Sequence, residues 1–212
     1  MGWCARYSDA VTTADLLLRA LQDCDELPLR PLPEHAAALL RELDAPPRLA
    51  AHLRAVHDVA GQLVEWVRLR YPDLRFDAEA VLFGAATHDV GKTLYPAELG
   101  SPGSEHEKAG RQLLLDHGVD GRLARFAATH ASWSDPDAEL GIGVEDLLVS
   151  LADKIWKNKR VPDLEDLVVN RLAGVSGRPV WEEFMELDEI LARIGEGADA
   201  RLSFQAAYPV HG

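Results

Sequence analysis

Hydrophobic residues recur at every third or fourth position through most of this chain, the spacing that places them on one face of an α-helix. No alternating run of hydrophobic and polar residues is long enough to predict a strand. We therefore predict an all-α fold of seven to nine helices, with residues 201–212, which show no clear period, left outside them. The predicted helical segments are 12–23, 34–43, 46–70, 77–89, 104–118, 121–132, 144–160, 162–174 and 179–195.

Prolines mark the first boundary along the chain. Residues 25–33 hold three of them, and a proline interrupts a helix because it lacks the backbone N–H. A length of 212 residues suits one well-packed domain with extensions better than two independent domains. We predict an N-terminal helical extension over 1–45, a main domain over 46–175, and a C-terminal helix and tail over 176–212 that pack on it.

The charge balance restricts the partners of the protein. The chain has 22 Lys and Arg against 35 Asp and Glu, so it lacks the surplus cations with which proteins neutralise nucleic-acid phosphates. No segment approaches the roughly 18 apolar residues of a membrane helix, and no secretory signal is recognisable. Cys4 and Cys24 lack metal-knuckle or redox spacing and are expected to be free thiols. We expect a cytoplasmic protein that binds neither nucleic acid nor membrane.

Three histidines are predicted to point into the helical core. His52 lies within the apolar stripe of its helix, whereas His57 lies at the edge of that stripe. His88 and His130 each follow small or apolar residues three, four and seven positions earlier, and the small Gly84 is expected to leave room beside the ring of His88. A lone histidine on an apolar face is more often a hydrogen-bonded core residue than a metal ligand. The prediction of a metal site therefore depends on all three histidines together.

Further polar residues join this group. His106 occupies the second position of its predicted helix, where the helix dipole disfavours a protonated ring. Asp153 lies opposite the apolar stripe of its helix, on a face that is either solvated or lines a cleft. If these side chains were all structural, each would need its own polar partner, whereas a single metal site satisfies them together.

The order of these residues resembles the signature of the HD superfamily of metal-dependent phosphohydrolases. The motifs that carry the resemblance are HLRAV, ATHDVGK, HEKAG, LARFAATH and SLADKI, within about residues 48–160. An ordered set of six ligands is far more specific than any single motif. The resemblance implies an HD-domain helical bundle within 46–175 and metal ligands at His52, His88, Asp89, His106, His130 and Asp153.

The resemblance also implies a chemistry. Asp89 would bridge two ions, one of them completed by His52, His88 and Asp153 and the other by His106 and His130. Nitrogen and oxygen ligands without sulfur suit Fe, Mn, Co, Ni or Zn. Two such ions activate a water that attacks a phosphoester or phosphoanhydride of a small molecule, and we expect a nucleotide. The chain looks most like the small bacterial HD hydrolases that split diadenosine tetraphosphate.

Four side chains are candidates for contact with the substrate. Lys92 follows the HD pair and is expected to contact a phosphate or a developing oxyanion, which places it with Asp89 in the catalytic centre; alternatively it only offsets the dipole of a helix end. Lys157 and Arg160, four and seven positions after Asp153, are expected to grip an anion. Trp133 either stacks a nucleobase or is a partly buried loop residue.

Two other functions remain open at this point. Some HD proteins with the same ligand types are mixed-valent di-iron oxygenases, and a degenerate HD module can bind a nucleotide as a sensor without catalysis. Segment 179–195 is long and acidic, and we expect it to pack either on the body or on a second copy in a homodimer.

Overall fold

The computed structural model describes residues 11–22, 27–131, 133 and 141–210, and within them the chain is helical and contains no strand. The all-α prediction is confirmed. Cys4, Cys24 and His211 lie outside the described residues. The α-helices are α1 (Thr13–Gln22), α2 (Glu34–Glu42), α3 (Pro47–Arg70), α4 (Ala78–Thr87), α5 (Glu105–Asp116), α6 (Gly121–Ala124), α7 (Phe126–Thr129), α8 (Val144–Ile155), α9 (Pro162–Ser176), α10 (Val180–Gly195) and α11 (Ala198–Ala206), with 3-10 helices η1 (Val90–Thr93) and η2 (Pro96–Leu99).

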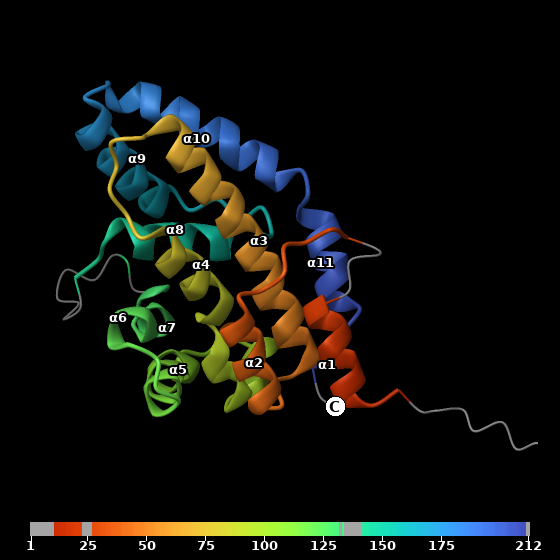
Figure 1. The fold of residues 1–212 in the computed structure, drawn as a ribbon. Coiled ribbons are helices and arrows are strands. Elements are labelled where there is room, and N and C mark those ends of the chain that lie inside the picture. The colour runs from red at the N-terminus through yellow and green to blue at the C-terminus, as the bar shows by residue number, and fades with distance from the viewer. Residues whose placement is uncertain (1–10, 23–26, 132, 134–140, 211–212) are drawn as a thin grey trace, which may run out of the picture.

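Helix α3 passes through the middle of the molecule (Figure 1) and packs against α1, α4, α8 and α11. Because neighbours surround it, α3 is buried on nearly every side rather than along one stripe. His57 is consequently buried as well, and its Nδ1 lies 3.1 Å from the carbonyl oxygen of Leu82. The prediction that His57 sits outside the inward face was wrong, since helical periodicity alone assumes one solvent-facing side.

The segments at both ends of the chain share the core of the central helices. Leu17 of α1, Leu40 of α2 and Leu191 of α10 belong to the same buried cluster. Helix α10 packs on α9 and α3, so the acidic segment lies on the body of the molecule. A homodimer stays a prediction, as does the division of the chain into 1–45, 46–175 and 176–212.

The C-terminal segment forms a helix that the sequence pattern did not reveal. Phe204 and Tyr208 lie four residues apart in and just after α11, are both buried, and contact each other with ring centroids 5.4 Å apart. Buried Arg201 on the same helix donates hydrogen bonds to backbone carbonyls of other helices. Two aromatics and a buried arginine therefore order a segment that lacks a continuous apolar stripe.

Helix α4 presents the HD pair at its C-terminal end. Asp77 begins the helix by accepting a hydrogen bond from the backbone N–H of Ala80 at 3.0 Å, as an N-cap residue does. A Cβ on Gly84 would lie 2.7 Å from the ring of Phe126, so this glycine makes room for α7. That Gly84 also leaves room beside the ring of His88 stays a prediction.

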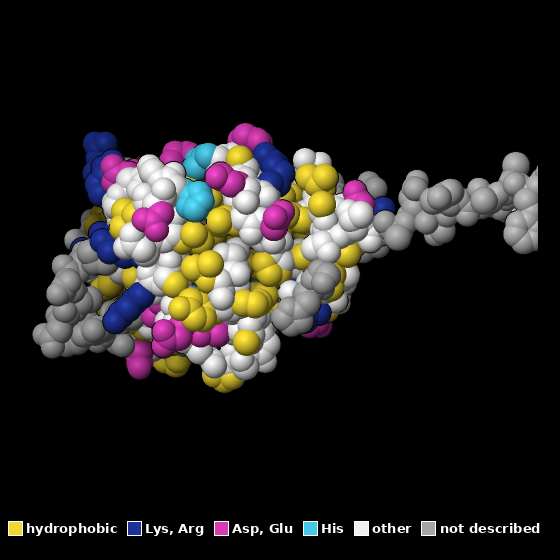
Figure 2. Space-filling view, turned by 90° about the horizontal axis from the view of Figure 1, so that it is seen from below, with side chains coloured by type: hydrophobic (Ala, Val, Ile, Leu, Met, Phe, Trp, Pro, Cys, Tyr) yellow, Lys and Arg dark blue, Asp and Glu magenta, His cyan; other side chains and the backbone are white. Residues whose placement is uncertain are grey.

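The described helices include none that is long and apolar enough to cross a membrane. On the face seen from below in Figure 2, hydrophobic side chains are scattered among polar ones, and Lys and Arg stand in small separate groups. No continuous basic band covers the described part of that face.

Candidate metal centre

Six side chains from five segments converge on one buried point, since His88 and Asp89 are neighbours in the sequence. His52 comes from α3, and His106 from the first turn of α5. His88 and His130 follow the last residues of α4 and α7, and Asp153 lies in α8. The six residues brought together are His52, His88, Asp89, His106, His130 and Asp153, and all of them are buried. They are the six that the motif order indicated.

Asp89 stands between two pairs of histidines. Its Oδ2 lies 3.1 Å from Nε2 of His52 and 3.7 Å from Nε2 of His88. Its Oδ1 lies 3.0 Å from Nε2 of His106 and 3.5 Å from Nε2 of His130. The two clusters of potential metal ligands therefore share one carboxylate.

Asp153 completes the side of the centre that holds His52 and His88. Its Oδ1 lies 3.4 Å from Nε2 of His88 and 3.8 Å from Nε2 of His52, and its Oδ2 accepts a hydrogen bond from Lys154. Only 7% of Asp153 is exposed, so its helix face lines the centre and is not simply solvated. The adjacent Lys154 was not anticipated from the sequence.

Hydrogen bonds fix the orientation of three of the imidazole rings. Nδ1 of His88 lies 3.0 Å from the carbonyl oxygen of Ala85, and Nδ1 of His130 lies 3.1 Å from that of Ala127. Because a carbonyl oxygen only accepts, each Nδ1 must carry the proton, which leaves the lone pair on the Nε2 that faces Asp89. This arrangement is the usual one for metal-binding histidines.

The carboxylate of Glu98 fixes the orientation of the His106 ring. This carboxylate, on η2, lies within hydrogen-bond distance of Nδ1 of His106. Sequence reasoning missed Glu98, because its position depends on how η1 and η2 fold back on α5. A Cβ on Gly91 would lie 2.0 Å from the backbone oxygen of His106, so only glycine lets η1 pack this closely on α5.

Several polar atoms at the centre are buried without a hydrogen-bond partner among the described residues. They are Nδ1 and Nε2 of His52, Nε2 of His88, Oδ1 of Asp89 and Nε2 of His106. An unsatisfied buried polar atom costs about 1–3 kcal/mol, so a cluster of them requires an explanation. A divalent cation with nitrogen and oxygen ligands satisfies these atoms, and the donor set therefore fits a metal.

The protonation states suit such a cation. Burial would raise the pKa of Asp89, but interaction with His88 and the close approach of Nε2 of His106 and of His52 hold that pKa well below its usual range. Burial lowers the pKa of His52 and lowers that of His130 to about 4. Burial acts the same way on His106, but Asp89 and Glu98 outweigh it and raise that pKa. Ionised carboxylates and mostly neutral imidazoles are the forms that bind metals.

A cavity of about 470 Å³ adjoins the centre at His52. Lys92 lines it, with Nζ 2.6 Å from Oδ2 of Asp89. Lys157 also lines it, with Nζ 5.7 Å from the centroid of the Trp156 ring. Both lysines are therefore placed to meet an anion that enters beside the histidines.

Residues 49–156 match the family model of the HD domain. The chain belongs to the HD domain family. HD domains form a superfamily of metal-dependent phosphohydrolases. The matched segment includes all six converging residues. No curated protein and no solved structure matches the chain. The family and the His and Asp clusters together indicate binding of a divalent metal.

Two of the expected substrate contacts lie elsewhere in this HD-domain protein. Arg160 pairs with Glu165 at 2.7 Å and with Asp188 at 2.9 Å, and it does not line the cavity. Helix α8 ends at Ile155, so a helical spacing counted from Asp153 no longer holds seven residues later.

Trp133 is partly buried in the core, and Nζ of Lys154 lies 5.5 Å from the centroid of its ring. Since Lys154 in turn contacts Asp153, Trp133 supports a neighbour of the centre and is not among the residues that line the cavity.

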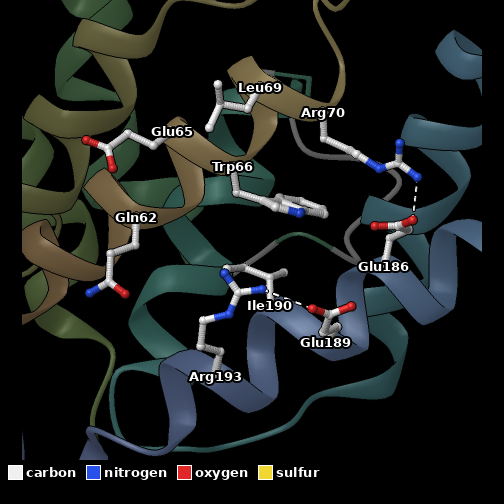
Figure 3. A pocket seen from close by; sticks show the side chains of 9 residues that line it. All are labelled: Gln62, Glu65, Trp66, Leu69, Arg70, Glu186, Glu189, Ile190 and Arg193. Carbon is white, nitrogen blue, oxygen red and sulfur yellow. Dashed lines mark hydrogen bonds and ion pairs between the residues drawn. The ribbon is translucent and has the colours of Figure 1, made fainter.

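A second cavity of the HD-domain protein, about 450 Å³, lies between α3 and α10. Trp66 points into it, and two ion pairs flank it (Figure 3). Arg70 pairs with Glu186, and Arg193 pairs with Glu189 at 3.1 Å. These charges already satisfy one another, so this groove lacks the unpaired polar atoms that distinguish the centre.

Proposed function

We propose that the protein is a dinuclear metal-dependent phosphohydrolase that cleaves a phosphoester or phosphoanhydride bond of a small molecule, with nucleotides as the expected class. The position of Asp89 carries the proposal. Each of its carboxylate oxygens faces a different pair of buried histidines, as a bridging ligand requires. His52, His88 and Asp153 would hold one ion, and His106 and His130 the other.

The donor set suits Fe, Mn, Co, Ni or Zn, because it offers nitrogen and oxygen without sulfur. Two such ions, when bound, lower the pKa of a water molecule and polarise the phosphoryl group. Lys92 would donate a hydrogen bond to a phosphoryl oxygen, because its ammonium lies beside Asp89. Lys157 would attract the anionic end of the substrate into the cavity.

The proposal is tested by a screen for phosphate release from nucleotides, dinucleoside polyphosphates and simple phosphomonoesters, with and without oxygen. We expect release from at least one class without oxygen, and loss of that release in Asp89→Ala. His117→Ala is the control, because His117 lies away from the centre, with its Nδ1 2.8 Å from the carbonyl oxygen of Leu113. Iron-dependent oxygen uptake without phosphate release would indicate an oxygenase instead, and binding without turnover would indicate a sensor.

A further inference from the structure

The cavity beside the metal centre is lined by residues of two chemical kinds. The charged and metal-facing residues are His52, Lys92, Glu98 and Lys157. The uncharged residues include Trp156, residues 99–102, which run from the end of η2 toward α5, and Leu202 and Gln205 of α11. A ligand that fills the cavity therefore meets both charged and neutral groups.

Helix α11 is fixed firmly against the centre although it lies outside the segment 49–156 that matches the family. Nε of Arg201 donates a hydrogen bond to the carbonyl oxygen of Trp156 at 2.8 Å, and the ring of Trp156 contacts that of His52 at 4.9 Å. Nε of Arg48 on α3 donates to the carbonyl oxygen of Tyr208 at 2.9 Å. Figure 1 shows α11 alongside α3.

The two side chains that α11 presents to the cavity are available to a ligand. Leu202 is 38% exposed and Gln205 is half-buried. Within the described residues, the side-chain amide of Gln205, which can both donate and accept, has no hydrogen-bond partner. The helix therefore offers one apolar contact and one unused amide, neither of which suits a phosphate dianion as a lysine does.

We propose that Leu202 and Gln205 select the substrate by binding its uncharged organic group, the part of the molecule from which the phosphate is cleaved. This inference rests on the proposed phosphohydrolase function. It also narrows the substrate class to a phosphomonoester with a compact neutral group that is partly apolar and carries hydrogen-bonding atoms, such as a nucleoside or a sugar. A volume of about 470 Å³ equals roughly 16 waters at ~30 Å³ each, enough for a phosphoryl group together with one such organic group.

The cavity offers few fixed cations to a longer phosphate chain. Among the described residues, Lys92 and Lys157 are the lysines that line it, and no arginine does. Glu98 adds a negative charge to the lining. The proposed metal ions would hold the reacting phosphoryl group, and beyond them these two lysines offset the charge of several further phosphates less well than that of a single phosphoryl group.

The test compares Leu202→Ala and Gln205→Ala with the wild-type protein. Titration calorimetry measures the dissociation constants of inorganic phosphate, nucleoside monophosphates, sugar phosphates and a dinucleoside polyphosphate. We expect each variant to weaken binding of the preferred monophosphate about tenfold, the effect of one lost contact of this kind, and to leave inorganic phosphate binding unchanged. Turnover should lose kcat/KM mainly through KM.

Two matched controls accompany these variants. Leu167→Ala removes a leucine that lies on α9 and is 40% exposed, close to the 38% of Leu202. Ser203→Ala changes an exposed residue of α11 itself that does not line the cavity. Both controls should bind every compound as the wild type does, and thermal unfolding should show that all four variants fold.

The inference is overturned if the variants weaken inorganic phosphate and the monophosphate equally, if they weaken neither, or if the dinucleoside polyphosphate binds most tightly to the wild type. Failure of the proposed function looks different. In that case the wild type releases no phosphate from any compound. If it nevertheless binds a monophosphate more tightly than inorganic phosphate, and the two variants lose this preference, selection by α11 is supported.

Discussion

The cavity beside the metal centre and the groove between α3 and α10 have similar volumes, and α3 contributes to both, yet the two regions differ in how their polar atoms are satisfied. In the groove, Arg70 and Arg193 each have a carboxylate partner (Figure 3). At the centre, imidazole nitrogens and a carboxylate oxygen are buried without hydrogen-bond partners among the described residues. The difference teaches that unsatisfied buried donor atoms, and not the size of a cavity, distinguish the candidate site.

Variants of two buried histidines of α3 test this comparison most directly, and they give the largest expected effect. We expect His52→Ala to lower phosphate release about 10³-fold, because it removes a proposed metal ligand. His57→Ala should lower the free energy of unfolding by about 1–3 kcal/mol and keep its activity, because the hydrogen bonds of His57, to the backbone of Leu82 and of Pro31, involve none of the six converging residues. Kinetics and urea unfolding of the two variants check both expectations. Equal activities would remove the distinction between the two positions.

The second largest effect concerns Glu98, which orients His106. Glu98→Ala should lower metal affinity or activity about 10- to 100-fold, as loss of a carboxylate behind a ligating histidine does. Glu98→Gln should recover part of that loss, because an amide oxygen still accepts a hydrogen bond from Nδ1. Glu105→Ala, at an exposed neighbouring position, is the control. Metal titration would refute the role of Glu98 if its removal left the affinity intact.

A substitution at Gly91 tests whether the close packing of η1 on α5 is needed to assemble the metal centre. Gly91→Ala places a methyl group against the backbone of His106, and we expect a loss of about 1–3 kcal/mol in the free energy of unfolding together with weaker metal binding. Gly100→Ala is the matched control, since a Cβ there meets nothing within 4 Å. Chemical denaturation of both variants measures the difference, and equal stabilities would contradict the close approach of η1 to α5.

The buried histidines predict how the metal-free protein responds to pH. Burial lowers the pKa of His52, His57 and His130 in the folded state, to about 4 for His130. Below about pH 6.5 the unfolded chain therefore binds protons that the folded chain does not, and the free energy of unfolding falls as the pH drops from 7 toward 4. His106 has a raised pKa and acts in the opposite sense, so it offsets part of this loss.

Urea unfolding in the presence of a chelator, repeated across that pH range, measures this effect. An unchanged or rising free energy of unfolding between pH 7 and pH 5 would contradict it.

The smallest effect is expected in the groove. Arg193→Ala breaks a surface ion pair with Glu189, which contributes about 0–1 kcal/mol, and should leave phosphate release unchanged. Activity assays of this variant test whether the groove differs in function from the metal centre. A clear loss of activity would assign a function to the groove.

The sequence was sufficient for most of the helices, because their apolar positions recur with a helical period, and for the six converging residues, because their identity and order are carried by local motifs. It was insufficient where long-range packing decides the outcome. Glu98 reaches His106 only through the fold of two 3-10 helices, and Arg160 turns away because α8 ends early. Helix α11 follows from two aromatic contacts and a buried arginine, none of which creates a periodic signal.

The central claim is that Asp89 joins two metal ions, and elemental analysis of the purified protein tests it most directly. We expect about two equivalents of divalent metal per chain, about one in a His106→Ala/His130→Ala double variant, and less than one in Asp89→Ala. A wild-type protein that holds a single equivalent, or an Asp89→Ala variant that keeps the full wild-type content, would contradict the account.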